Sequence, residues 1–113
     1  MPIDADRLLK LTMELRRGAL VLAVLSALQN EHYGYSLRKQ LSDLGLDIDE
    51  GTLYPLMRRL ETQGLLVSHW REEQGRKRRF YQIAEDGKEA LLVMTQEWQK
   101  LNAALSNIAP LGE

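Results

Sequence analysis

The sequence predicts a mainly α-helical fold that contains one small β-hairpin. Two observations lead to this fold class. Apolar residues recur at helical spacing in the first 63 residues and again after residue 84, and between residues 66 and 83 they follow the period of strands. The chain has 113 residues, 44% of them hydrophobic and 27% charged, which suits one compact unit. A core of this size is only marginally stabilising, so association with a second copy would help.

The composition excludes several classes of protein and site. There is no cysteine, which removes disulfides, thiolate catalysis and cysteine-ligated metals and fits a reducing compartment. The longest apolar run, residues 19–28, has about half of the roughly 20 residues that a membrane-spanning helix needs. No small-residue cleavage pattern follows this run. We therefore expect a cytoplasmic protein that does not engage a membrane.

Two helices are expected at the start of the chain. Residues 5–14 are interpreted as a short helix, with Leu8, Leu11 and Leu15 at spacings of three and four. Residues 16–29 are apolar on nearly all sides, as in a helix that is buried over most of its surface. Both belong to the scaffold of the domain.

The next helix is predicted over residues 35–44. Leu37, Leu41 and Leu44 fall on one of its faces, which should pack on the core. Gly45 follows directly and suits the left-handed position that ends many helices.

The stretch DEGTLYPLMRRLETQGLL, residues 49–66, predicts a helix with Pro55 inside it. Asp49 is a favourable N-cap, and Gly64 is placed to end the helix. Proline costs about 3 kcal/mol in a helix interior. The cost should be lower here, because the residue four positions earlier is Gly51 in the first turn. The predicted buried face carries Leu53, Leu56, Met57 and Leu60, and the exposed face carries Thr52, Tyr54, Pro55, Arg58, Arg59 and Thr62.

A β-hairpin with a basic tip is predicted after this helix. Residues 66–70 and 79–83 are rich in strand-forming side chains and flank the polar loop REEQGRKR, which contains Gly75. From residue 52 to residue 79, seven Lys or Arg stand against three Asp or Glu, a local charge of +4 in a chain whose total is −1. A charge run is often only a solvated surface, and this alternative stays open until the structural setting is considered.

Helices followed by such a hairpin are typical of the winged helix-turn-helix, so residues 1–83 are interpreted as a DNA-binding unit with an N-terminal helix. In this fold the third helix enters a major groove and the hairpin, or wing, touches the flanking backbone. The start of the helix at residues 51–55 carries few large side chains, so it can approach phosphates closely. Tyr35 and Lys39 either reach phosphates or lie in solvent. The candidate DNA-contacting residues are Tyr35, Lys39, Gly51, Thr52, Tyr54, Pro55, Arg58, Arg76, Lys77 and Arg78.

Residues 84–113 are predicted to form a C-terminal dimerisation helix. Apolar residues from 91 to 108 are spaced 3, 4, 3, 4 and 3, as in a coiled-coil seam. The alternative is that this stripe packs on its own domain, but the apolar faces of the three-helix core are already filled. A twofold dimer would present two recognition helices to the half-sites of a pseudo-palindromic duplex. The predicted dimer residues are Leu8, Leu11, Leu15, Leu91, Met94, Trp98, Leu101, Leu105 and Ile108.

Five segments of the chain together resemble the PadR family of transcriptional regulators: LRRGALVLAVLSAL, HYGYSLRKQL, DEGTLYPLMRRLETQGLL, GRKRRFYQI and EDGKEAL. The resemblance implies a dimeric winged-helix repressor that a small molecule, such as a phenolic acid or a drug, releases from DNA. The chain length resembles the short subgroup with a single C-terminal helix. The chain departs from the family at Ala84, where relatives usually carry a threonine cap worth about 1 kcal/mol.

Trp98 is the candidate centre of an effector site. It falls in the middle of the seam, where two indoles of a dimer could face each other across a gap for a flat aromatic molecule. Met94, Leu20 and Val21 would then form apolar walls. The alternative is that Trp98 only fills the interface. The resemblance favours the slot, because some drug-sensing relatives place a tryptophan at the matching point.

No other chemistry is expected. His32 and His69 are far apart and have no further ligands at metal spacing, so neither a metal site nor a cofactor is predicted. No nucleophile elbow, Walker loop or paired carboxylate motif indicates an enzyme. Trp70 is expected in the core. Two functions remain: a ligand-responsive DNA-binding repressor, or a winged-helix protein-interaction module without DNA binding. The absence of large aliphatic side chains around residues 52–55 favours the repressor.

Overall fold

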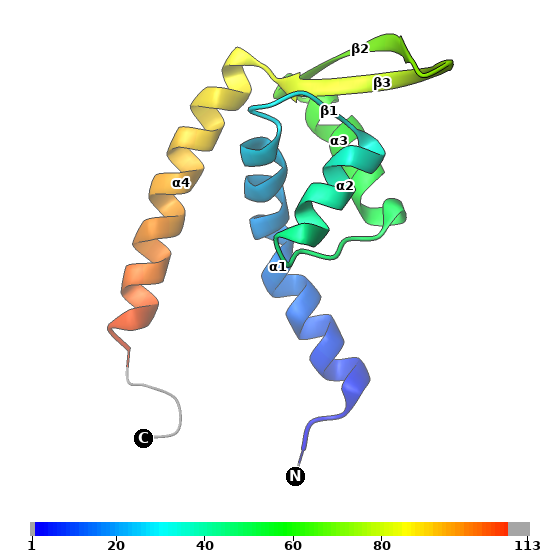
Figure 1. Ribbon diagram of the computed structural model, residues 1–113. Helices are drawn as coiled ribbons and strands as arrows, with labels where there is room; N and C mark the ends of the chain where they lie inside the picture. Colours follow the sequence, from blue (N-terminus) through cyan, green and yellow to red (C-terminus); the bar gives the residue numbers. More distant parts are fainter. Residues whose placement is uncertain (1, 109–113) are drawn as a thin grey trace.

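The computed structural model describes residues 2–108 and has a mainly helical fold with one small antiparallel sheet (Figure 1), which confirms the predicted fold class. Helices α2 and α3 pack beside the second half of α1, the sheet lies above them, and α4 runs back alongside α1. The molecule is elongated, with extents of 56 × 32 × 23 Å. Its elements are α1 (Ala5–Ala27), β1 (His32–Tyr33), α2 (Gly34–Asp43), α3 (Glu50–Thr62), β2 (Leu66–Glu73), β3 (Arg76–Ile83) and α4 (Glu85–Ser106).

The first helix is continuous, so the predicted division into residues 5–14 and 16–29 is wrong. Asp4 caps α1 by accepting a hydrogen bond from the backbone N–H of Arg7 at 2.9 Å. Gly18 lies inside the helix and lowers helix propensity by about 1 kcal/mol relative to alanine. A single glycine does not stop a helix whose second half is held by tertiary packing.

One hydrophobic core joins all the elements. Its residues come from the second half of α1, from the inner faces of α2 and α3, and from the base of the sheet. Leu44 was predicted to belong to it but is 73% exposed, because α2 ends at Asp43 and Gly45 reverses the chain with φ +96°. Leu46 packs against the core instead. The buried core residues are Val24, Leu25, Leu28, Leu37, Leu41, Leu53, Met57, Leu60, Leu66, Tyr81 and Ile83.

The hairpin has longer strands than the sequence predicts. The turn consists of only Gln74 and Gly75, with φ values of 53° and 77°, which is the pattern of a tight type I′ turn. The expected loop over residues 71–78 is therefore mostly strand, and Arg76, Lys77 and Arg78 lie in β3. Opposite charges pair across the strands near the tip, where Glu72 faces Lys77 and Glu73 faces Arg76. The two-residue strand β1, which was not predicted, pairs with β3.

The junction between the hairpin and α4 is tightly packed. Ile83 N–H donates to the carbonyl of Leu28 at 2.8 Å, and Ala84 N–H donates to the carbonyl of Leu65 at 2.9 Å. Ala84 provides no side-chain cap, yet α4 begins directly after it at Glu85. A Cβ placed on Gly87 would lie 2.1 Å from the Leu65 carbonyl oxygen, so only glycine lets α4 approach the chain this closely.

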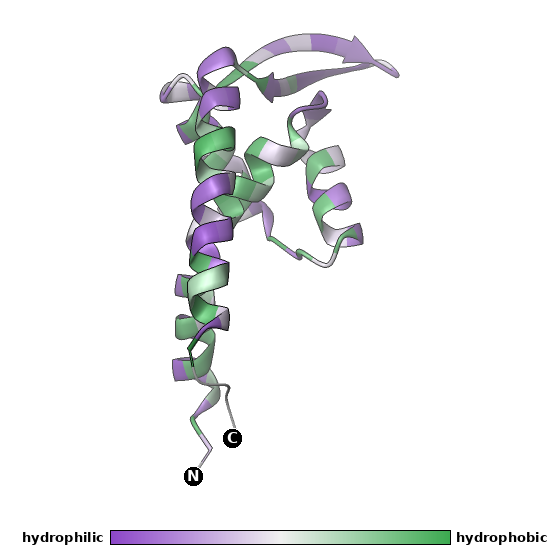
Figure 2. Cartoon of the chain, turned by 90° about the vertical axis from the view of Figure 1, so that its left-hand side faces the viewer, coloured by the Kyte–Doolittle hydropathy of each residue, from purple (hydrophilic) through white to green (hydrophobic). Residues whose placement is uncertain are grey.

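The first half of α1 and the second half of α4 project beyond the core and expose apolar side chains (Figure 2). Leu91 and Met94 of α4 pack against the core, whereas Trp98 is 49% exposed and Leu105 is 67% exposed. On α1, Leu8, Leu11 and Leu15 are all exposed. No described helix combines the length and apolarity needed to cross a bilayer. The predicted C-terminal unit continues to residue 113, but α4 ends at Ser106 and residues 109–113 lie outside the described part of the chain.

Two glycine-to-alanine substitutions should have opposite effects on stability. Gly87→Ala places a methyl group against the Leu65 carbonyl, and we expect it to lower the free energy of unfolding by about 1–3 kcal/mol or more. Gly18→Ala meets no atom within 4 Å in the same kind of element and should raise it by up to about 1 kcal/mol. Urea denaturation of the two variants and the parent measures both. Equal effects would mean that the contact at Gly87 does not constrain the fold.

Candidate nucleic-acid interface

Helix α3 presents the surface that the sequence singled out. We call it the reading face: exposed Thr52, Pro55, Arg58, Arg59 and Thr62, together with half-buried Tyr54. Pro55 lies inside α3 as predicted. Asp49 occupies the N-cap position, but its carboxylate accepts a hydrogen bond from the Thr52 hydroxyl at 2.8 Å and not from the helix backbone.

Tyr54 sets the distance between α2 and α3. A Cβ on Gly34, the first residue of α2, would lie 2.7 Å from Cε1 of the Tyr54 ring, so the ring rests directly on the backbone there. Burial raises the pKa of the Tyr54 phenol, and the nearby charge of Glu50 raises it further. The hydroxyl is therefore a neutral hydrogen-bond donor at physiological pH.

The start of α2 is fixed by Ser36. Its hydroxyl accepts from Tyr33 N–H at 3.1 Å, donates to the Tyr33 carbonyl at 3.0 Å and lies 3.0 Å from Nδ1 of His32. An ion pair between Arg38 and Glu50 at 3.4 Å connects α2 to the start of α3. Tyr35 is left exposed. This exposure permits the phosphate contact considered for Tyr35 but does not select it over solvent.

Two arginines of the hairpin are neutralised by carboxylates. Arg79 donates to Glu61 of α3 at 2.9 Å and to Ser68 at 2.9 Å, and Ser68 also donates to Glu61. This network ties the base of the wing to the end of α3. Arg71 forms an ion pair with Glu31 at 2.6 Å and a second with Glu73 at 3.3 Å. These two arginines hold the wing in place and contribute little net positive charge.

The remaining cations of this region have no carboxylate within 4.0 Å among residues 2–108. Arg78 lies over the ring of Tyr33, with its guanidinium carbon 4.3 Å from the ring centroid. The Nε atom of Arg78 is buried and has no hydrogen-bond partner in the described chain. The net positive charge of the region therefore rests on Arg58, Arg59, Arg76, Lys77 and Arg78.

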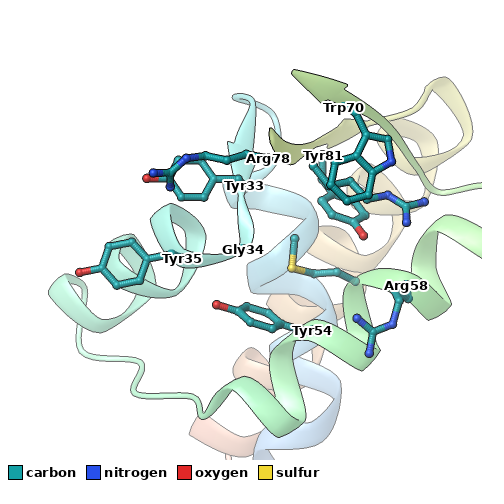
Figure 3. A pocket seen from close by; sticks show the side chains of 10 residues that line it. Tyr33, Gly34, Tyr35, Tyr54, Arg58, Trp70, Arg78 and Tyr81 are labelled. Carbon is teal, nitrogen blue, oxygen red and sulfur yellow. The ribbon is translucent and has the colours of Figure 1, made fainter. Parts of the chain in front are cut away.

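A hollow of about 370 Å³ lies between the reading face, the start of α2 and the hairpin (Figure 3). Four of the predicted DNA-contacting residues line it: Tyr35, Tyr54, Arg58 and Arg78. Trp70 also lines it and is 63% exposed, so its expected core position is wrong. The hairpin extends past the helices at this point, and both of its faces then meet solvent. The other lining residues are Tyr33, Gly34, Met57, Arg79 and Tyr81.

Sequence reasoning did not identify Tyr33, Trp70 and Tyr81 as residues of this surface. Only Tyr33 carried a local signal, because Gly34 separates it from Tyr35 and a glycine between two aromatics is typical of a close approach by another segment. Trp70 and Tyr81 are brought together by strand register, which the pattern of a single segment does not specify.

The remaining predicted site residues lie elsewhere. Thr52 and Pro55 line a separate hollow with Leu20 of α1, and Lys39 lines a polar hollow beside the loop that follows α2. Val21 and Met94 pack against the core. Arg76 and Lys77 stand at the exposed tip end of β3.

These features define a class of protein: a winged helix-turn-helix with a basic wing beside an exposed third helix. Residues 21–92 match the model of the transcriptional regulator PadR-like family, and the chain belongs to this family. It therefore falls among transcriptional regulators and not among enzymes.

Individual relatives agree with this assignment. The chain is 44% identical over 79 residues to transcriptional regulator Rv3488 of Mycobacterium tuberculosis, covering 69% of this chain and 74% of the relative. It is similar to the crystal structure of a PadR family transcriptional regulator from Eggerthella lenta, with a TM-score of 0.84 and 42% identity over 91% of this chain and 92% of the other. A PadR-like transcriptional regulator from Bacillus cereus has a TM-score of 0.78 and 29% identity, covering 88% and 99% of the two chains.

The contact between Gly34 and Tyr54 can be tested by a double-mutant cycle. Gly34→Ala should lower the free energy of unfolding by about 1–3 kcal/mol, because the new methyl group displaces the ring. In a Tyr54→Ala background the same substitution should cost far less, since the ring is gone. Thermal or urea denaturation of the four proteins gives the coupling. A cost that is equal in both backgrounds would contradict the spacing role of Tyr54.

Proposed function

We propose that this protein is a sequence-specific, dimeric transcriptional repressor whose α3 enters the major groove while the β2–β3 hairpin touches the flanking backbone. The observation that carries the proposal is the division of charge beside the reading face. Arg79 and Arg71 are held by carboxylates, whereas Arg58, Arg76, Lys77 and Arg78 have no such partner among the described residues. Cations in this position are available for phosphates and base edges.

The alternative, a protein-interaction module without DNA binding, is less well supported. Such a module would be expected to present a continuous apolar patch on its working surface. Apart from Trp70, the surface around the reading face is polar and basic, and the exposed leucines gather on α1 and α4 (Figure 2). A cytoplasmic location, as predicted from the sequence, suits a protein that acts on DNA.

The exposed apolar surface of α1 and α4 supports a homodimer. Leu8, Leu11 and Leu15 on α1 and Leu101 and Leu105 on α4 are each more than half exposed. A monomer rarely leaves stripes of this length open to water. A second copy of the chain offers the same stripes in return, as a twofold interface requires. Two copies of α3 would then face the two half-sites of a pseudo-palindromic operator.

A small planar aromatic effector completes the proposal. Trp98 stands on the exposed part of α4, where the twofold partner would bring a second indole close to it. Met94 and Val21 lie at the core end of the same region and Leu20 is half-buried nearby on α1, so these residues would supply the walls of the slot. Binding there would release DNA only by as much free energy as separates the ligand's affinities for the two dimer states.

DNA binding should depend on Arg58 and on the wing. We expect Arg58→Ala to weaken binding of a promoter fragment from upstream of the protein's own gene by about 1–3 kcal/mol, because the arginine no longer reaches a base edge. Replacing Arg76 and Lys77 by glutamine should also reduce the slope of log affinity against log salt by roughly 0.9 for each phosphate that is no longer neutralised. Lys100→Ala on exposed α4 is the control and should change neither. Equal binding by parent and wing variant in a low-salt gel shift would contradict the proposal.

The dimer should depend on the apolar stripe of α4. Leu101→Glu would bury an unpaired charge in the interface at a cost of several kcal/mol, so the dimer should dissociate or fail to fold. Leu44→Glu makes the same change at another exposed leucine, outside the stripe, and should leave the dimer intact. Light scattering at micromolar concentration measures the mass of each. A monomeric mass for the parent chain would defeat the dimer proposal.

A further inference from the structure

The hollow beneath the hairpin has the size and walls of a small-molecule site. Its volume of about 370 Å³ falls within the range of roughly 300–1,000 Å³ that is usual for ligand pockets. Trp70 and Tyr81 stand on its hairpin side, Tyr54 stands on its α3 side, and Met57 lies between them (Figure 3). Walls of this kind accept a flat ring, because aromatic faces and edges pack closely on one another.

The polar groups of the hollow favour a negatively charged ligand. Arg58 and Arg78 line it, and neither has a carboxylate partner within the described residues. The buried Nε of Arg78 lacks any hydrogen-bond partner in residues 2–108, which is costly for a charged group until an acceptor arrives. Arg79, in contrast, is already satisfied by Glu61 and Ser68.

The same groups disfavour other ligands. No carboxylate lines the hollow, so it offers nothing to a cation. Burial raises the pKa of both Tyr54 and Tyr81, so their phenols stay neutral and add no negative charge. A carboxylate can accept two parallel hydrogen bonds from a guanidinium. A planar ring that carries a carboxylate therefore matches the walls and the cations together.

We propose that this hollow binds a small planar aromatic carboxylate, and that its occupation excludes DNA. The exclusion rests on the proposed function, because Tyr54 and Arg58 belong both to the hollow and to the reading face. Binding of the ligand does not rest on it. The hollow is complete within one chain, whereas the slot at Trp98 requires a second copy.

Trp70 makes the site observable. In a Trp98→Phe variant Trp70 is the only indole, and titration with 2-naphthoate should change its fluorescence and saturate at one ligand per chain. The uncharged 2-naphthamide should bind at least about tenfold more weakly, because it cannot form the charged hydrogen bonds. Calorimetry of the unmodified chain gives the same constants independently of fluorescence.

Two arginine variants test the role of charge. Arg78→Gln should weaken 2-naphthoate binding about tenfold or more. Arg76→Gln removes the same charge from the same strand outside the hollow, and should leave the affinity for 2-naphthoate unchanged. Equal affinities of acid and amide, or equal effects of the two arginine variants, would overturn the proposal. So would a response that persists in Trp70→Phe and is carried by Trp98.

Competition with DNA separates this inference from the function on which it partly rests. With the promoter fragment bound, rising 2-naphthoate should displace the DNA, and Arg78→Gln should need about tenfold more ligand relative to its own DNA affinity. Promoter binding without any 2-naphthoate binding would overturn the ligand site and leave the regulator standing. Binding of 2-naphthoate by a chain that binds no promoter DNA would contradict the proposed function while supporting the ligand site.

Discussion

The packing of every element around the second half of α1 is the constraint on which the structure depends. Val24, Leu25 and Leu28 are fully buried, and α2, α3 and the sheet place their apolar residues around them. Leu28 also holds the hairpin through its carbonyl, which accepts the N–H of Ile83. A small domain has little stability to spare, so this shared core fixes the angle between α3 and the wing more firmly than any single polar contact does.

Carboxylates then decide which basic side chains face outward with their charge intact. Exposed ion pairs stabilise a fold by only about 0–1 kcal/mol each, so Glu31 and Glu61 contribute little to stability in this way. Their larger effect is on geometry, because Glu61 holds Arg79 and Ser68 at the base of the wing. The positive charge that remains lies on one side of the molecule, although the chain as a whole has a net charge of −1.

Periodicity predicted what depends on local sequence and missed what depends on register. The extent of α3, the position of Pro55 within it and the glycine at residue 64 were predicted, since each follows from spacing along one segment. The two-residue strand β1 is too short to have a pattern, and the charged strand ends of the hairpin resemble a loop. The hollow depends on which residues of separate segments meet, as Gly34 meets Tyr54 and Trp70 faces Arg79. One sequence contains little record of such pairings.

The two-residue turn at Gln74 and Gly75 makes the hairpin a lever that is held at one end. Its base is fixed by Phe80 and Tyr81, which are buried, whereas the strands beyond them are flanked by solvent. Strand pairing keeps the lever straight along its length, and the two strands bend together because no loop separates them. The basic tip can therefore follow duplexes of different groove width while the core keeps its shape. Shape, and not only sequence, becomes a property of the operator to which this chain responds.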